Sequence, residues 1–260
     1  MRRLLTLFTA LVLAAAAPAA GGKQLSIRWL GQSFFLLTTS AGTRIAFDPH
    51  AIEQFGRPTV EADLVLISHP HPDHTRIDSI TNKGKFKVIE GIKVTPPAAE
   101  GGPPRTTWNH VEETFKDVKV RTVPTYHDTV QGMSRGKNTV FVLEADGLHI
   151  VFLGDLGHVL TDDQVRQIGP VDILFVPIGG VYTLNGSKAK EVVAQLKPTR
   201  YVIPMHYGVR VFEDLLPPDE FLDGQKNVQR MLKTNELKVS TDVVPPAPVT
   251  VLLGWEASKK

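Results

Sequence analysis

The sequence predicts a single α/β domain of layered sheets, and three observations support this prediction. Apolar residues make up 42% of the 260-residue chain and charged residues 22%, which is typical of a compact globular protein. Short β-like segments fill the first half, and helical and strand segments alternate in the second. No linker-like change in composition divides the chain, so we expect one domain over residues 20–260.

The first 19 residues are typical of a signal peptide. Arg2 and Arg3 precede an apolar segment at 4–17, and small residues follow at 17–19. This segment is shorter than the roughly 20 residues of a membrane-spanning helix, so we expect cleavage after Ala19 and a periplasmic or secreted protein. The two arginines leave both the Sec and the twin-arginine export routes open. Because the chain has no cysteine, a lipoprotein signal and disulfides are excluded.

After removal of this leader the chain has no basic excess. The formal charge of +2 comes from 29 Lys and Arg against 27 Asp and Glu, and Arg2 and Arg3 account for the whole difference. Without a block of basic residues, binding to nucleic acid or to an anionic membrane has no electrostatic support. We therefore expect no nucleic-acid partner and, after removal of the leader, no stable membrane anchor. The oligomeric state stays open.

The mature chain begins with three short β-like segments followed by a buried strand. Residues 25–30, 33–38 and 44–47 are separated by glycine-containing turn signals, which indicates an antiparallel start to a sheet. Residues 63–68 contain Leu-Val-Leu-Ile, which is apolar on both faces and suits a central strand. His69 follows directly at the end of this strand.

The middle of the chain has a mixed pattern. Strands are expected at 86–90, 92–95 and 118–123, around a Pro/Gly-rich loop at 96–104. This loop and the segment 128–137 either border the substrate, as surface loops over a rigid site commonly do, or are plain connectors.

The second half begins with a hairpin. Strands at 139–144 and 148–153 flank Asp146-Gly147, a dipeptide that favours a tight turn. Thr161 is a candidate N-cap for the helix that follows. The remaining expected elements alternate along the chain, with helices at 162–168, 187–196 and around 218–232, and strands at 173–177, 201–204 and 249–253.

The strongest chemical signal is the segment His69-Pro70-His71-Pro72-Asp73-His74. It holds four candidate metal ligands directly after a buried strand, where α/β sheets place their sites. The two prolines restrict the residues before them to extended conformations, so both imidazoles can project from a stiff loop. The adjacent Asp73 and His74 diverge unless the chain turns, which indicates a second metal ion beside the first. A solvated turn with surface histidines is the alternative, but three histidines so close together argue against it.

This segment matches the H-x-H-x-D-H motif of the metallo-β-lactamase superfamily, and later segments match the remaining motifs in order. The matches are His127 in Val-Pro-Thr-Tyr-His-Asp, Asp155 in Phe-Leu-Gly-Asp-Leu-Gly-His and His206 in Ile-Pro-Met-His-Tyr-Gly. The resemblance covers residues 27–208. It implies an α/β fold of the metallo-β-lactamase type, the αβ/βα four-layer sandwich, with the metals at one sheet edge.

Within the superfamily the chain resembles the L-ascorbate-6-phosphate-lactonase-like branch. The similar segments are Ile-Arg-Trp-Leu-Gly, Gly-Asp-Leu-Gly-His, and Pro-Ile-Gly-Gly-Val-Tyr-Thr before Pro-Met-His-Tyr-Gly. The branch often has an acidic residue where this sequence has Asn185, so a role that depends on a carboxylate there is not expected.

The resemblance implies two divalent metal ions. The implied ligands are His69, His71 and His127 for the first metal, Asp73, His74 and His206 for the second, and Asp155 as a bridge. Imidazole nitrogens and carboxylate oxygens suit Zn²⁺, our first expectation, and also Mn²⁺ or Fe²⁺, because no cysteine singles out zinc. Di-iron electron-transfer relatives have an acidic residue where His71 stands, which favours hydrolysis over redox chemistry.

These ligands imply a metal-dependent hydrolase. Two cations about 3.5–4 Å apart would lower the pKa of a shared water and polarise the oxygen under attack, so a metal-bridging hydroxide would cleave a small ester, lactone or phosphodiester. The expected catalytic carboxylates are Asp73, as proton relay, and Asp155. Tyr207 and His158 either orient ligands and donate to a developing oxyanion or simply pack. The sequence has no nucleophile elbow and no nucleotide-binding glycine motif, and it leaves the proton donor to the leaving group unassigned.

The other polar candidates have less specific roles. Asp48 either hydrogen-bonds a ligand imidazole or ends its strand. His50, His110 and His149 are expected not to be ligands, because His149 alternates within a strand and the other two lie in polar connections.

Two other functions stay open. A non-catalytic metal- or ligand-binding module would keep the site without turnover, although such proteins usually lose ligands and none is missing here. A mononuclear iron oxygenase of the same fold would share several ligands and consume O₂. β-Lactam hydrolysis is not expected, because superfamily membership alone does not choose a substrate.

Overall fold

The computed structural model describes residues 22–97 and 104–255, and within them the chain forms two large sheets that pack face to face. The first sheet has six strands, in the order β15 (Glu236–Ser240), β1 (Gln24–Trp29), β2 (Phe35–Thr38), β3 (Arg44–Phe47), β4 (Leu64–Ile67) and β5 (Lys87–Glu90). The expected leader at 1–19 and most of the loop at 96–104 lie outside the described residues.

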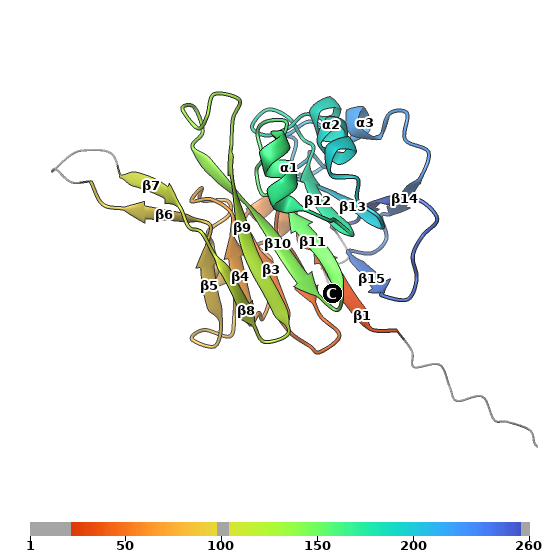
Figure 1. Cartoon of the computed structure of the whole chain (residues 1–260), viewed down its shortest axis with the longest axis horizontal. Coiled ribbons are helices and arrows are strands. Elements are labelled where there is room, and N and C mark those ends of the chain that lie inside the picture. Colours follow the sequence, from red (N-terminus) through yellow and green to blue (C-terminus); the bar gives the residue numbers. More distant parts are fainter. Residues whose placement is uncertain (1–21, 98–103, 256–260) are drawn as a thin grey trace, which may run out of the picture.

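The second sheet has eight strands. Their order is β14 (Val228–Met231), β16 (Val249–Leu253), β13 (Tyr201–Met205), β12 (Ile173–Pro177), β11 (Leu148–Phe152), β10 (Lys137–Ala145), β9 (Val118–Tyr126) and β8 (Glu112–Phe115). A separate hairpin of β6 (Ile92–Thr95) and β7 (Arg105–Trp108) projects from the body (Figure 1).

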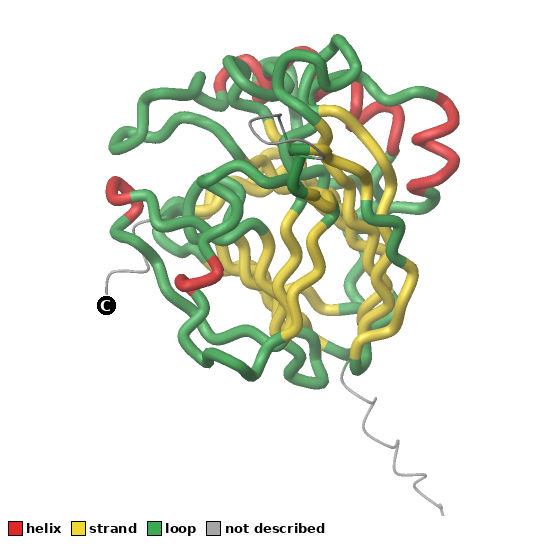
Figure 2. Tube along the Cα trace, turned by 90° about the vertical axis from the view of Figure 1, so that its left-hand side faces the viewer, coloured by secondary structure: helices red, strands yellow, loops and turns green. Residues whose placement is uncertain are grey.

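Helices are few and lie beside the second sheet. They are α1 (Asp162–Ile168), α2 (Gly186–Leu196) and α3 (Asp219–Leu222), with α1 in contact with β9 and α2 with β12. The first sheet carries on its outer face a smaller apolar cluster that includes Ile80, directly after the short 3₁₀ turn η2 (Ile77–Ser79). The other 3₁₀ turn, η1 (Glu53–Phe55), contributes Phe55 to the main core. Figure 2 shows the strands grouped in the middle of the molecule with helices and loops around them. In this described part of the chain, no helix has the length and apolar character needed to span a bilayer.

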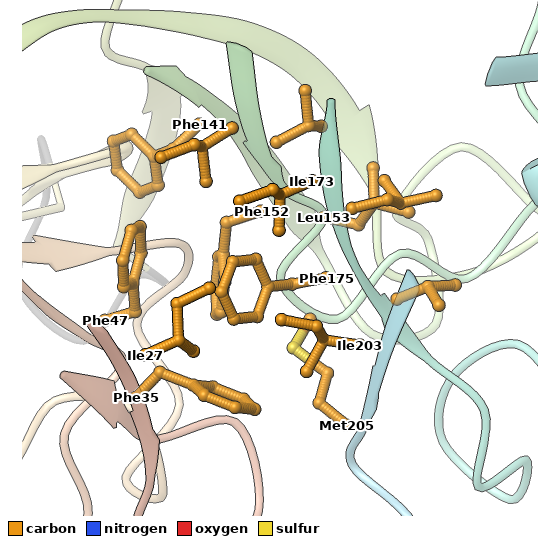
Figure 3. Packing of buried hydrophobic residues seen from close by; sticks show 14 of the residues in the cluster. Ile27, Phe35, Phe47, Phe141, Phe152, Leu153, Ile173, Phe175, Ile203 and Met205 are labelled. Atoms are coloured by element: carbon orange, nitrogen blue, oxygen red, sulfur yellow. The ribbon is translucent and has the colours of Figure 1, made fainter. Parts of the chain in front are cut away.

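The core lies between the two sheets and is rich in aromatic rings. Phe47 of the first sheet stacks on Phe152 of the second at 4.7 Å between ring centroids, and Phe35 meets the edge of Phe175 at 4.8 Å (Figure 3). All four side chains are fully buried. Because close-packed interiors resist rearrangement, this core fixes the distance between the sheets and therefore between loops at their edges.

Strand direction brings several loops to one edge of the sandwich. Strands β1, β2 and β3 are antiparallel, as the sequence predicts, whereas β3, β4 and β5 are parallel. In the second sheet β11, β12 and β13 are parallel, and β9 runs in their direction because β10 is antiparallel to both β9 and β11. The carboxyl ends of parallel strands meet at the same edge of a sheet, which is where α/β folds place their sites.

Local signals in the sequence correspond to observed turns and caps. Asp146 and Gly147 both have positive φ, +53° and +79°, as the expected tight hairpin turn requires. Thr161 caps α1, and Gln164 completes a capping box with it. The side chain of Asn185 accepts a hydrogen bond from the Lys188 N–H at 3.0 Å, so this residue is the N-cap of α2.

The helix expected around 218–232 is wrong. The helix α3 is four residues long, Gly224 follows it at φ +76°, and residues 228–231 form β14 instead. Parallel pairing with β16 supplies the backbone partners that a longer helix would have supplied, so tertiary pairing overrides the local preference. The prediction also missed β7, β8 and β15, which are short and carry polar residues, and β15 pairs with β1 from the other end of the chain.

Candidate metal centre

The seven residues proposed as ligands come together at one edge of the sandwich. Four lie in the loop after β4, and His127, Asp155 and His206 follow β9, β11 and β13. Their ligand atoms form two groups in which all atoms lie within 4.8 Å of one another, namely His69, His71 and His127, and Asp73, His74 and His206. These are the two sets that the resemblance implies.

Asp155 lies between these two groups. Its Oδ2 is 3.1 Å from His206 Nε2, 3.3 Å from both His74 Nε2 and His127 Nε2, and 3.8 Å from His69 Nε2. Burial alone would raise the pKa of this carboxyl, but the nearby His206 and His74 hold that pKa well below its ordinary value. A single buried carboxylate oxygen therefore faces two imidazoles from each group.

The first group fits a cation. His69 Nε2 and His71 Nδ1 are 3.1 Å apart, so the two ring nitrogens point toward the same place. Burial lowers the pKa of both His69 and His71, with further lowering by neighbouring histidines. Neutral imidazoles are the form that binds metal.

The second group fits a cation as well. His74 Nε2 is buried and has no hydrogen-bond partner, although it lies 3.4 Å from Asp73 Oδ2. Burial would lower the pKa of His74, but the carboxylates of Asp155 and Asp48 raise that pKa well above its ordinary value. The carboxylates of the cluster thus favour positive charge at this point, which a divalent cation would provide in place of a proton.

Asp48 fixes two of these imidazoles from behind. Its Oδ2 is 2.9 Å from His74 Nδ1 and accepts a hydrogen bond from Ser68 Oγ at 2.6 Å, while its Oδ1 accepts the Ser68 N–H at 2.7 Å. Ser68 Oγ in turn lies 2.9 Å from His69 Nδ1. The expectation that Asp48 hydrogen-bonds an imidazole of the cluster is confirmed. The two Nδ1 atoms are engaged, so both Nε2 atoms are left to face the centre of the cluster.

Gln32 and Asn138 are positioning residues that the sequence analysis missed. Gln32 donates from Nε2 to Asp73 Oδ2 at 3.0 Å, and its backbone carbonyl accepts the His206 N–H at 3.2 Å. Asn138 Oδ1 accepts the Asp155 N–H at 3.0 Å. Single amide residues in a turn and a strand give no motif, so only the Gly31 turn before Gln32 could have drawn attention to that position.

The two weaker catalytic candidates do not line the cluster. His158 Nε2 accepts the Tyr126 N–H at 3.1 Å and its Nδ1 donates to the Val159 carbonyl at 2.9 Å. These bonds leave His158 no donor for an oxyanion, so it holds the end of β9 instead. Tyr207 is 3% exposed and stacks on Trp29 at 5.3 Å, which places it in the core, where burial raises its pKa.

The three histidines expected not to be ligands belong to none of the candidate groups among the described residues. The expectation that His50 lies in a polar connection is wrong, however, because the side chain is fully buried and contacts the Phe34 ring. Its Nε2 lies 3.0 Å from the Gly31 carbonyl and its Nδ1 accepts the Ile52 N–H at 3.1 Å. Burial lowers the pKa of His50 to about 4.

A cavity of about 280 Å³ opens onto the cluster. Its lining residues are His71, Asp73, His127, Arg135, Asp155, Tyr182 and His206. Arg135 belongs to the segment 128–137, for which the sequence left a place beside the substrate and a plain connector as alternatives, and its position in the cavity favours the first. Tyr182 was not singled out from the sequence. A larger groove of about 710 Å³ lies between β5 and β8 but contains none of the seven clustered residues.

Comparisons with known proteins agree with this fold. Residues 26–206 match the family described as Beta-lactamase superfamily domain. A UPF0173 metal-dependent hydrolase of Thermococcus onnurineus is 32% identical over 227 residues, which cover 81% of this chain and 97% of that protein. One from Pyrococcus furiosus is 30% identical over 228 residues with the same two coverages.

A solved structure is also similar over most of its length. The protein, from Thermotoga maritima and described as a Zn-dependent hydrolase of the metallo-β-lactamase superfamily, has 32% identity and a TM-score of 0.67. The match covers 88% of this chain and 99% of that chain. The predicted fold and the predicted class of metal-dependent hydrolase are confirmed. This chain belongs to the metallo-β-lactamase superfamily and, within it, to the UPF0173 metal-dependent hydrolases.

Proposed function

We propose that the protein is a dinuclear hydrolase of small esters, lactones or phosphodiesters. The observation that carries this proposal is the position of Asp155 Oδ2, within 3.8 Å of imidazole nitrogens from both groups. A carboxylate in that position can bridge two cations. The cavity volume of about 280 Å³ supports a compact substrate.

The chemistry would depend on both groups of ligands. When bound, two divalent cations would supply Lewis acidity toward the substrate oxygen and lower the pKa of a water molecule between them. Asp73 is our candidate to take up the proton of the attacking water, because its side chain is 39% exposed whereas that of Asp155 is 2% exposed. Gln32 orients Asp73, and Asp48 orients His74, so both contribute to catalysis by positioning.

Zinc is the metal we propose first. The cluster offers imidazole nitrogens and carboxylate oxygens, which suit Zn²⁺, Mn²⁺ and Fe²⁺. The similar Thermotoga maritima protein is described as Zn-dependent, which favours zinc among them. The sequence resemblance to the lactonase-like branch favours lactones among the substrates.

The proposal is tested by a hydrolysis panel. Protein treated with chelator and reconstituted with Zn²⁺ or Mn²⁺ is assayed on 4-nitrophenyl esters, γ- and δ-lactones and bis(4-nitrophenyl) phosphate. We expect metal-dependent hydrolysis of at least one class, and a loss of at least about a hundredfold in kcat/KM in Asp155→Asn. The matched control is Asp163→Asn on the exposed face of α1, which should retain activity.

Two results would contradict the proposal. Hydrolysis of none of these bonds by reconstituted protein would favour a binding module, and metal-dependent O₂ uptake in the presence of a reductant would favour an oxygenase. Full activity in Asp155→Asn would show that the Asp155 carboxylate does not contribute to hydrolysis.

We also propose that the protein is exported to the periplasm or secreted. The Arg2-Arg3 start and the apolar segment after it support this location. Amino-terminal sequencing of protein recovered from the periplasm or the medium should give a mature end near residue 20. Full-length protein confined to the cytosol would contradict export.

A further inference from the structure

Arg135 is a cationic side chain in a cavity that would already hold two divalent cations. Its Nη2 donates to the Val181 carbonyl at 3.1 Å, and its guanidinium carbon lies 4.8 Å from the centroid of the Tyr182 ring. Within the described residues no carboxylate forms an ion pair with it. A guanidinium in such a position is repelled by the cations unless an anion is bound between them.

The loop that carries Arg135 is fixed by one carboxylate. Asp128 accepts hydrogen bonds from the backbone N–H groups of Val130, Gly132, Ser134 and Arg135 at 2.7–2.9 Å. These four charge-assisted bonds hold the loop at the mouth of the cavity, directly after His127. The position of the guanidinium is therefore built into the fold, which lowers the entropic cost of using it to bind a ligand.

Backbone strain in the segment that contacts Arg135 supports the same role. Val181 is a β-branched residue with φ +55°, a backbone conformation that such residues rarely adopt. This residue presents its carbonyl to Arg135, and the next residue presents the Tyr182 ring. Strained residues of this kind are maintained where a ligand clamp or active site requires them.

We propose that the substrate carries an oxyanion, either a carboxylate or a phosphate, separate from the bond that is cleaved, and that Arg135 binds it. The inference rests on the proposed function, because it assigns a feature to the substrate of the same site. The planar fork of a guanidinium matches both kinds of oxyanion with two parallel hydrogen bonds. Tyr182 keeps the guanidinium in place by stacking on it.

Binding of three related anilides tests this proposal directly. Acetanilide is neutral, succinanilate carries a carboxylate, and phosphonoacetanilide carries a phosphonate; all three contain an amide in place of a labile ester. Calorimetry on the metal-loaded protein should give binding of an anionic anilide about ten- to a hundredfold tighter than that of acetanilide. The anionic anilide that binds more tightly identifies the oxyanion as a carboxylate or a phosphate.

Variants assign the preference to Arg135. The ratio of the affinity for the anionic anilide to that for acetanilide should fall to near one in Arg135→Gln. It should keep an intermediate value in Arg135→Lys and decrease in Tyr182→Ala. The matched control, Arg166→Gln on α1, should leave it unchanged, and thermal unfolding of each variant verifies that it is folded. Equal affinity for the three anilides, undetectable binding of both anionic ones, or a preference that survives Arg135→Gln would overturn the proposal.

The corresponding esters separate this inference from the proposed function. If succinanilate binds through Arg135 but neither 4-nitrophenyl acetate nor 4-nitrophenyl hemisuccinate is hydrolysed, the anion site stands and the hydrolase proposal is weakened. If both esters are hydrolysed with equal kcat/KM and no anilide is preferred, the anion site is wrong and the hydrolase proposal stands.

Discussion

Asp48 illustrates how one side chain sets the chemistry of its neighbours. It is fully buried, lies in a positive-φ conformation at +42°, and engages Ser68 and His74. The negative charge and the two acceptor oxygens together keep the Nδ1 side of His74 occupied. Its position directly after β3 made a strand-ending role plausible from the sequence, whereas its contact with an imidazole 26 residues away depends on the fold.

Replacing Asp48 should weaken metal binding without removing a ligand. In Asp48→Asn the negative charge is lost and the amide can turn a donor toward His74, so His74 is held less well. We expect an affinity loss of about 10- to 100-fold for one of the two cations, as is usual for partners that orient ligands. Competition with a chromophoric chelator measures it, and Asp163→Asn serves as the control. An unchanged affinity would show that the hydrogen bond between Asp48 and His74 does not contribute to metal binding.

The buried His50 should make the fold sensitive to mild acid. Burial lowers the pKa of His50 to about 4, below the ordinary value of 6.5, so the unfolded chain binds this proton more readily. The stabilisation is therefore fully present above pH 6.5 and is lost as the pH falls toward 4, by about 3 kcal/mol in total. Denaturant unfolding of metal-free protein at pH 7 and pH 4.5 should show a smaller pH effect in His50→Gln. An equal change in the free energy of unfolding between pH 7 and pH 4.5 in wild type and His50→Gln would contradict this expectation.

At the scale of elements, two glycines allow the ligand loops to approach each other. A Cβ on Gly157 would lie 2.3 Å from the backbone carbon of His127, and one on Gly179 would lie 2.1 Å from the His206 carbonyl oxygen. The loops after β11 and β12 therefore pack on the backbones of the loops after β9 and β13. His206 itself has φ +50°, a conformation that residues other than glycine adopt only where the surrounding structure imposes it.

Gly179→Ala should displace His206, because backbone atoms cannot rotate out of the way as a side chain can. We expect a loss of stability at least about 1 kcal/mol larger than in Gly84→Ala, and weaker binding of one cation. Gly84 is the matched control, since a Cβ there meets nothing within 4 Å. Its replacement by alanine loses stability only because alanine is strained at a φ of +74°. Thermal unfolding and chelator competition measure the two effects. Equal losses in both variants would contradict the close approach.

Elements with strong local signals could be predicted from the sequence, and those that depend on distant pairing could not. The apolar strand β4 and the Asp146-Gly147 hairpin follow from local patterns. Strands β14 and β15 owe their conformation to β16 and β1, so no local pattern revealed them. In the site, the motif predicted which side chains gather. Gln32 and Tyr182 contribute a side-chain amide and a ring from loops with positive-φ residues, Gln32 itself and Val181, and only the fold brings these loops to the site.

For the whole molecule, folding and metal binding should be coupled. The sandwich holds residues from four separate loops around buried carboxylates, and the unfolded chain has no such arrangement. A cation that binds only the folded state at about a hundred times its Kd stabilises it by about 2.7 kcal/mol. For a domain of this size, chelation should therefore lower Tm by at least about 5 °C.

Differential scanning fluorimetry with and without chelator measures this shift, and restoring Zn²⁺ should reverse it. The shift should be smaller in Asp155→Asn, which lacks the carboxylate that faces both groups of ligands. A Tm that does not change on chelation would contradict the expected coupling between metal binding and folding.

The most direct measurement is the number of metal ions bound per chain. Mass spectrometry of protein reconstituted with Zn²⁺ and freed of excess metal should give two ions per chain. His71→Ala and His206→Ala, which remove a ligand from only one group each, should lower that number toward one. Wild-type protein that binds a single ion or none would contradict the paired site on which the proposed chemistry depends.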